Sequence, residues 1–97
     1  MKMTQDEFAR DMANRTGLSI TKSKLYTNYV LNTLKDILSE GNEITFIGLG
    51  NFYIKKMDDK IIKAPNGKDY MSKKHSIIRF TASPVLNRKL NENINDN

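Results

Sequence analysis

The sequence predicts an α+β fold in which a helical hairpin precedes a three-stranded antiparallel sheet, a protruding ribbon and a short last helix. Apolar residues recur with a helical period up to about residue 39, and with a period of two from Glu43 onward. Lysines, rather than core residues, dominate the segment 57–74. Leu, Ile, Val and Phe make up 24 of the 97 residues, which is enough apolar material for one folded domain over 1–97.

The first helix is predicted over about Gln5–Thr16. Thr4 and Glu7 have the spacing of a capping box, in which the first side chain accepts a hydrogen bond from the backbone of the second. Gly17 suits the left-handed residue that ends many helices. The residues Phe8, Ala9, Met12 and Ala13 form one apolar stripe along this helix.

A second helix is predicted from Ser19 or Thr21 to about Ser39, and Gly41 closes the helical hairpin of residues 1–41. We expect one apolar face on this helix, wider than a single neighbouring helix requires. That predicted face consists of Leu25, Tyr29, Val30, Leu34, Ile37 and Leu38, with Leu31 at its margin.

Alternating apolar residues then predict three strands. The first covers Glu43–Ile47, a turn follows at Gly48–Gly50, and the returning strand covers Asn51–Lys56. The third strand is predicted over Ser76–Thr81, where Ile77, Ile78 and Phe80 restore strand character.

Between the second and third strands, residues 57–74 predict two extended segments joined at a tip. Their strongest turn signal is Ala64-Pro65-Asn66-Gly67. A ribbon without an apolar face has nothing to bury, so we expect it to be mobile by itself. The pair Ile61-Ile62 either packs on Met57 or Met71 within the ribbon, or contacts a ligand.

The last helix is predicted to begin after Ser83 as N-cap, with Pro84 in its first turn. Leu86, Leu90 and Ile94 give it a single apolar stripe. We expect the asparagine-rich end of residues 91–97 to fray, so that 83–97 comprises a helix and a frayed tail.

The net charge of +5 is concentrated in one part of the chain. Residues 1–48 hold six basic and six acidic residues, whereas residues 55–79 hold eight basic and three acidic ones. A local surplus of this kind indicates a surface for a polyanion, and a solvated charged surface is the alternative.

Several classes of site lack the residues they need. The chain has no cysteine, which excludes thiolate metal sites, and one histidine, His75, which excludes a metal cluster built from several histidines. No apolar run approaches the ~18 residues of a membrane-spanning helix. We therefore expect no enzymatic activity, no metal, no cofactor, no small-molecule substrate and no membrane insertion. The absence of cysteine suits the reducing cytoplasm.

The segment Gly48-Leu49-Gly50-Asn51-Phe52 resembles the Gly-Phe-Gly-Thr-Phe segment of the bacterial histone-like HU and integration host factor family. Thr16-Gly17-Leu18-Ser19 and Phe80-Thr81-Ala82-Ser83 resemble the family's first turn and its closing strand and helix. The resemblance implies an intertwined dimer, either a homodimer or a heterodimer with a paralogue. In such a dimer, strands within 42–56 and 75–82 form a saddle, and the arms of residues 57–74 wrap double-stranded DNA.

The family's arm ends in a proline that wedges between base pairs from the minor groove, and Pro65 matches it. The DNA-binding residues that the resemblance implies are Lys55, Lys56, Lys60, Lys63, Pro65, Asn66, Lys68, Lys73, Lys74 and Arg79. The implied core of the dimer contains Leu34, Leu38, Leu49, Phe52 and Phe80.

The chain also departs from the family's pattern. The usual Arg-Asn-Pro tip reads Lys63-Ala64-Pro65, and a position that is usually basic is Met57, followed by two aspartates. Pro84 and Asn87 stand where the family commonly has lysines. These differences bear on DNA affinity and bending strength rather than on fold, because lysine lacks the forked guanidinium group of arginine.

The resemblance implies an architectural protein of the nucleoid that bends or compacts duplex DNA with little sequence preference. A chromosome, a plasmid or a phage could carry it. The alternative is a structural dimerisation module whose basic arm binds RNA or an acidic protein.

Overall fold

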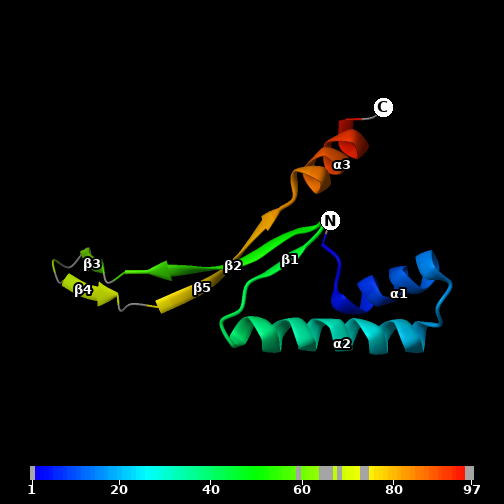
Figure 1. Cartoon of the computed structure of the whole chain (residues 1–97), viewed down its shortest axis with the longest axis horizontal. Coiled ribbons are helices and arrows are strands. Elements are labelled where there is room, and N and C mark those ends of the chain that lie inside the picture. Colours follow the sequence, from blue (N-terminus) through cyan, green and yellow to red (C-terminus); the bar gives the residue numbers. More distant parts are fainter. Residues whose placement is uncertain (1, 59, 64–66, 68, 73–74, 96–97) are drawn as a thin grey trace. The chain divides into compact units, whose positions relative to one another are not determined.

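The computed structural model describes residues 2–58, 60–63, 67, 69–72 and 75–95, with no account of the side chains of 60–63, 69–72 and 95. The chain divides into two compact units, Met1–Ser39 and Glu40–Asn97 (Figure 1). The predicted order of elements is confirmed. These elements are α1 (Gln5–Thr16), α2 (Ile20–Ser39), β1 (Ile44–Phe46), β2 (Gly50–Met57), β3 (Lys60–Lys63), β4 (Asp69–Ser72), β5 (His75–Ala82) and α3 (Pro84–Asn95).

Helix α1 has the ends that its sequence predicts. The backbone N–H of Glu7 donates to the Thr4 hydroxyl at 3.1 Å, and that hydroxyl donates to the Glu7 carboxylate at 3.1 Å. At the other end, Gly17 adopts φ 79° and its N–H bonds the carbonyl of Ala13 at 3.0 Å. Both local signals therefore set the length of the helix.

Small side chains line the crossing of α1 and α2. Ala9 and Ala13 are buried on α1, and Ser23 and Thr27 are buried on α2, with Ser23 wholly enclosed. The Thr27 hydroxyl lies 4.0 Å from the sulfur of Met12 on α1. Small residues of this kind allow two helices to pack closely at their crossing.

The residues predicted for one wide apolar face of α2 differ in burial within a single chain. Leu25, Tyr29 and Val30 are exposed, whereas Leu34 is half-buried and Leu38 is buried. At 3.6 residues per turn, Leu25 lies roughly 140° around the helix from Leu38, so a face that holds both is wider than one neighbouring helix covers. The assignment of the exposed residues to one apolar face stays a prediction.

The second unit contains a three-stranded antiparallel sheet in the order β1-β2-β5. Strand β1 is shorter than predicted, because Glu43 and Ile47 lie outside it. The Glu43 carboxylate accepts the backbone N–H of Ile54 at 2.9 Å, a bond that a longer β1 could otherwise have made through its backbone. Strand β2 is the central strand and runs one residue beyond its predicted range at each end.

Gly50 begins β2 at a point where another strand comes very close. A Cβ placed on Gly50 would overlap the carbonyl oxygen of Thr81 and lie 2.6 Å from Cζ of Phe80. Only glycine fits there without displacing the Phe80 ring, which explains the second glycine of the Gly-Leu-Gly segment.

The segment between β2 and β5 contains the two extended pieces that its sequence predicts. Strands β3 and β4 pair antiparallel, from Lys60 opposite Ser72 to Lys63 opposite Asp69. Of the predicted turn Ala64-Pro65-Asn66-Gly67, residues 64–66 lie outside the described residues, and Gly67 adopts φ 80°. Ile61 lies opposite Met71 in the register of β3 and β4. Whether its side chain packs within the ribbon or contacts a ligand stays a prediction.

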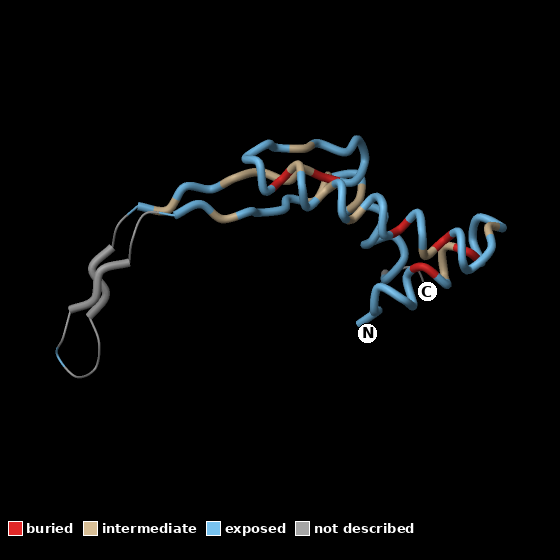
Figure 2. The backbone as a smooth tube through the Cα atoms, turned by 90° about the horizontal axis from the view of Figure 1, so that it is seen from below, coloured by how far each residue is buried: buried red, intermediate tan, exposed pale blue. Residues whose placement is uncertain are grey.

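Helix α3 begins as predicted, with the Ser83 hydroxyl accepting the N–H of Val85 at 3.2 Å and Pro84 as first residue. The backbone N–H of Ser83 also donates to the Leu49 carbonyl at 2.9 Å, which joins the start of α3 to the β1–β2 turn. The helix continues to Asn95, further than its asparagine-rich composition predicts. Most of the described chain is exposed, with buried positions at few places (Figure 2).

Candidate nucleic-acid interface

The sheet has two chemically different faces. Successive residues of a strand point to opposite faces, and residues directly opposite one another on paired strands share a face. The register pairs Phe52 with Phe80, and Tyr53 with Arg79. One face, here termed the apolar face, contains Ile44, Phe46, Phe52, Ile54, Ile78 and Phe80, with Lys56 and Ser76 at its end. The other, the polar face, contains Thr45, Asn51, Tyr53, Lys55, Met57, His75, Ile77, Arg79 and Thr81.

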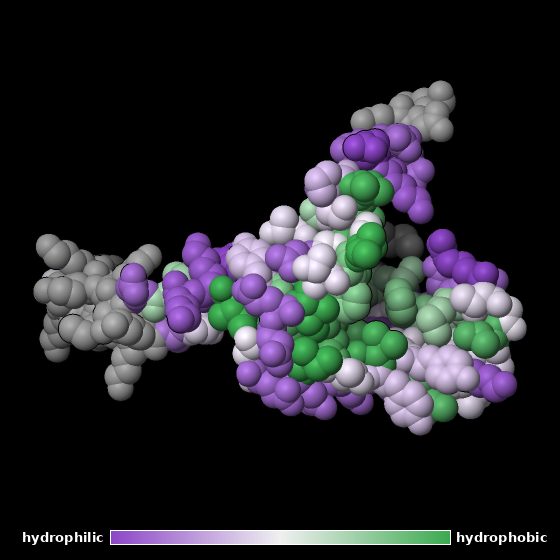
Figure 3. Space-filling model, in the orientation of Figure 1, coloured by the Kyte–Doolittle hydropathy of each residue, from purple (hydrophilic) through white to green (hydrophobic). Residues whose placement is uncertain are grey.

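The apolar face carries an aromatic cluster that one chain leaves largely open. The rings of Phe52 and Phe80 lie 4.8 Å apart, and that of Phe46 lies edge-on to Phe52 at 6.2 Å. Phe80 is nevertheless 44% exposed and Ile78 51% exposed. Figure 3 shows hydrophobic residues, in green, at the surface on one side of the molecule. A face of this kind indicates a binding surface.

The five residues predicted for a dimer core fall in both units. Phe52 and Phe80 meet on the apolar face, and Leu49 lies in the adjoining turn with 44% of its surface exposed. Leu34 and Leu38 belong to α2 in the first unit. The assignment of these residues to a dimer core stays a prediction.

The polar face holds two of the predicted DNA-binding cations, Lys55 and Arg79, and both are exposed. The same face holds Asn51, whose side-chain oxygen accepts a hydrogen bond from the Thr45 hydroxyl at 2.8 Å. This bond directs the oxygen of Asn51 toward β1, and the NH2 group is the donor end of the same side chain. Sequence reasoning did not single out Thr45, Asn51 or Tyr53, although the alternation from Lys55 backward along β2 could have found the last two.

Lys56 lies on the opposite face from Lys55. It pairs with Ser76 at the end of the apolar face, and its side chain is exposed. The sequence grouped the two adjacent lysines as one site, but the pleat of the strand separates them. The role of Lys56 in DNA binding stays a prediction.

The other predicted contacts belong to the ribbon. The backbones of Lys60 and Lys63 lie in β3. Pro65, Asn66, Lys68, Lys73 and Lys74 lie outside the described residues. This part of the candidate site therefore stays a prediction.

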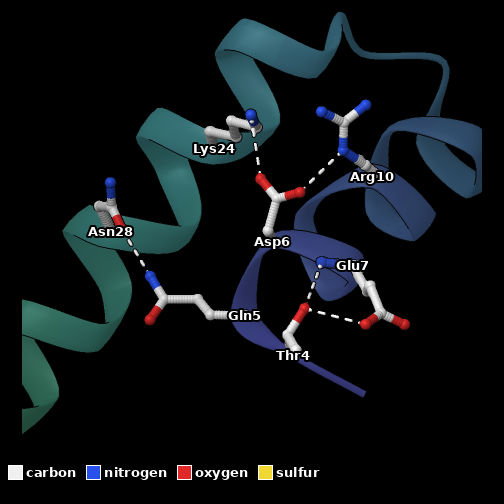
Figure 4. A network of polar contacts seen from close by, with 7 residues as sticks. All are labelled: Thr4, Gln5, Asp6, Glu7, Arg10, Lys24 and Asn28. Carbon is white, nitrogen blue, oxygen red and sulfur yellow. Dashed lines mark hydrogen bonds and ion pairs between the residues drawn. The ribbon is translucent and has the colours of Figure 1, made fainter.

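Polar contacts between α1 and α2 centre on Asp6 (Figure 4). Its carboxylate accepts Arg10 Nε at 2.9 Å and pairs with Lys24 Nζ at 3.0 Å. The hydrogen bond from Arg10, followed by that from Lys24, holds the pKa of Asp6 below its ordinary value of 3.8. Beside it, Gln5 donates to Asn28 at 2.6 Å. These contacts connect two helices and have no arrangement suited to acid-base chemistry.

The described part of the chain contains no group of three or more His, Cys, Asp or Glu side chains that could hold a metal ion. None of its helices is long and apolar enough to cross a membrane.

The family model for bacterial DNA-binding proteins matches residues 3–91. The chain belongs to this family. The match confirms the resemblance to HU and integration host factor noted from the glycine-flanked segment. The family is one of DNA-binding architectural proteins and not a family of enzymes.

Similar curated proteins are integration host factor alpha subunits. That of Nitrobacter hamburgensis is 25% identical over 96 residues, covering 98% of this chain and 87% of the relative. That of Bdellovibrio bacteriovorus is 26% identical over 90 residues, covering 92% and 82%. That of Myxococcus xanthus is 28% identical over 90 residues, covering 92% and 70%.

A cocrystal structure of Anabaena HU with DNA matches with a TM-score of 0.82 and 17% identity, covering 91% of this chain and 97% of that chain. The likeness confirms the predicted fold class, in which three helices accompany a three-stranded antiparallel sheet.

Proposed function

We propose that this protein, as a dimer, binds duplex DNA with little sequence preference and bends or compacts it. One observation carries the proposal: the sheet presents an apolar face and a polar face with exposed cations, and its two long strands lead toward a basic ribbon. The apolar face provides a surface for a partner chain, and the polar face with the ribbon provides a surface for phosphates. Membership of the family supports duplex DNA as the polyanion.

The dimer accounts for the open aromatic cluster. Burial of apolar surface contributes about 25 cal/mol per Å2, and a chain of this size gains greatly from a core shared with a second copy. In the described part of the chain, the buried apolar residues are Ala9, Ala13 and Leu38. A homodimer is the simplest assembly that covers Phe80 and its neighbours, and a heterodimer with a paralogue would use the same surface.

Phosphate contacts by lysine and arginine supply the affinity in this proposal. Each neutralised phosphate releases counterions, so binding weakens steeply as salt concentration rises. Lys55 and Arg79 are the described cations of the polar face, and the lysines of the ribbon extend the same charge along the DNA. Such contacts position the protein without reading sequence.

Bending is assigned to the tip of the ribbon. An apolar side chain that inserts between base pairs costs a few kcal/mol of unstacking per step, which the added wrapping contacts offset. Pro65 is the candidate wedge. Deformable steps and nicked or pre-bent DNA are therefore expected to bind best. Such a protein would work at the cytoplasmic nucleoid, where duplex DNA is concentrated.

A competition gel-shift experiment tests the choice of polyanion. Labelled duplex DNA is challenged with unlabelled duplex DNA, duplex RNA and polyglutamate at matched total charge. We expect duplex DNA to compete best, because the arms are proposed to enter a minor groove of B-form shape. Equal or better competition by RNA or polyglutamate would instead support a module that binds RNA or an acidic protein.

A further inference from the structure

Tyr53 lies at the centre of the polar face of the sheet. Its strand, β2, is flanked by β1 and β5, and its register partner on β5 is Arg79. Lys55 follows two residues later on the same strand and therefore shares this face. Arg79 and Lys55 are both exposed, and Tyr53 is half-buried. A tyrosine thus stands between two of the cations that the proposed function assigns to phosphates.

The tyrosine side chain combines an apolar ring with a polar hydroxyl, which forms a hydrogen bond wherever an acceptor or water is within reach. Asn51, the preceding residue of β2 on this face, accepts a hydrogen bond from the Thr45 hydroxyl at 2.8 Å. The Glu43 carboxylate accepts the Ile54 amide at 2.9 Å. In the described part of the chain, the Tyr53 hydroxyl has no protein partner of this kind, so it stays available to an external acceptor.

Resting on the proposed DNA-binding function, we propose that Tyr53 is a DNA contact whose hydroxyl donates a hydrogen bond to a backbone phosphate. Tyrosine hydroxyls are among the side-chain donors that proteins use for phosphate oxygens. In a regular sheet, residues directly opposite lie about 5 Å apart, and residues two apart along a strand lie about 6.7 Å apart. One strand of duplex DNA carries a phosphate for about every 3.4 Å of its axis. Arg79, Tyr53 and Lys55 therefore match phosphates that lie within a few nucleotides of one another.

This contact differs from those of the cations because the hydroxyl is uncharged. A lysine or arginine that neutralises a phosphate releases counterions, which makes binding depend on salt concentration. A neutral donor adds a hydrogen bond without releasing counterions, so its contribution should be the same at every salt concentration. One neutral hydrogen bond corresponds to a change in affinity of about three- to tenfold. A loss of affinity without a change in salt dependence is therefore the signature of this contact.

The test is the DNA-binding affinity of the full-length protein, measured by fluorescence anisotropy on a short labelled duplex at several salt concentrations. Tyr53→Phe removes the hydroxyl and keeps the ring, so the packing of the strand is retained. Tyr29→Phe makes the same change on α2, where Tyr29 is 60% exposed, and is the matched control. Lys55→Ala provides the comparison with a charged contact. Thermal unfolding at equal protein concentration establishes that every variant is folded.

We expect Tyr53→Phe to bind DNA about three- to tenfold more weakly at every salt concentration, with the parent's slope of log affinity against log salt. Tyr29→Phe should bind like the parent, and Lys55→Ala should reduce the slope by up to about one unit. Parent-like affinity of Tyr53→Phe would overturn the proposal and leave the proposed function standing. A loss that changes the slope, or that Tyr29→Phe equals, would overturn it in the same way. A parent that binds no DNA would overturn the proposed function itself.

Discussion

Asp6 is the residue through which charge connects the two helices of the first unit. Its carboxylate pairs with Arg10 on its own helix and with Lys24 on α2. Both pairs are exposed, so each contributes modestly and is weakened by salt.

Replacing Asp6 with Asn should reduce stability at neutral pH and leave stability near pH 2 almost unchanged. The pKa of Asp6 is lowered by its pairs with Arg10 and Lys24, so its stabilisation is present above the ordinary value of 3.8. It is lost as pH falls through the lower pKa of the folded state. Urea unfolding of parent and variant between pH 2 and pH 7 measures the effect. An equal loss at both ends of this range would mean that packing, and not charge, explains it.

Gly50 and Gly48 allow a matched comparison of two glycines in one turn. Gly48 has φ 81° with open space around a Cβ, so Gly48→Ala should cost only the backbone strain, about 1–2 kcal/mol. Gly50→Ala adds the collision with Phe80 and the Thr81 carbonyl, so a further cost of about 1–3 kcal/mol is expected. Denaturant unfolding at equal protein concentration measures both. If Gly48→Ala proves the more damaging change, the close approach at Gly50 does not limit the fold.

At the scale of the element, the pleat of β2 separates two lysines that are adjacent in the sequence. Lys55 lies on the polar face with Arg79, and Lys56 lies at the end of the apolar face. The two side chains have the same charge and are both exposed, so they form a natural control pair.

Lys55→Ala should weaken DNA binding across all sequences and reduce the salt dependence by up to about one unit. Lys56→Ala should have a smaller effect on both, because its side chain points to the other face of the sheet. Affinities measured at several salt concentrations test this order. The reverse order would place DNA on the apolar face.

Local signals in the sequence determine where most elements begin and end. The capping box at Thr4, the left-handed Gly17 and the Ser83-Pro84 pair each act within one helical turn, and the structure follows all three. The composition around β3 and β4 likewise predicts an extended pair because the Pro-Asn-Gly turn signal lies between them.

Features that depend on packing were harder to predict. The burial of Ser23 and Thr27 at the crossing of α2 with α1 was not predicted, because a hydrophobicity pattern does not reveal small polar residues in that role. At the start of β1, the Glu43 side chain accepts the Ile54 amide, a contact that the alternation of apolar residues does not predict. The family resemblance supplied the candidate DNA-binding lysines. The register then shows that Lys55 shares a face with Arg79, whereas Lys56 lies on the face of Phe52 and Phe80.

At the scale of the whole molecule, the exposed aromatic cluster predicts an obligate dimer. Its melting temperature should rise with protein concentration, because folding and association are coupled. Light scattering should give about twice the 11.1 kDa mass of one chain. Phe80→Asp, which places a charge on the apolar face, should shift the protein to unfolded chains at low concentration. A folded monomer of one chain's mass at micromolar concentration would contradict the assembly.

The basic ribbon is proposed to hold DNA through its lysines and to bend it through its tip. Energy transfer across a doubly labelled duplex, recorded with affinity over a range of salt concentrations, tests both parts in one titration. The parent protein should bring the DNA ends together.

The double change Lys60→Ala and Lys63→Ala should weaken binding and reduce the salt dependence by up to about two units, one per lost phosphate contact. Pro65→Ala should leave the salt dependence nearly unchanged and reduce the bend, because a methyl group is a poorer wedge than a pyrrolidine ring. An unchanged bend with Pro65→Ala, together with an unchanged salt dependence in the double lysine variant, would show that the ribbon does not lie along DNA.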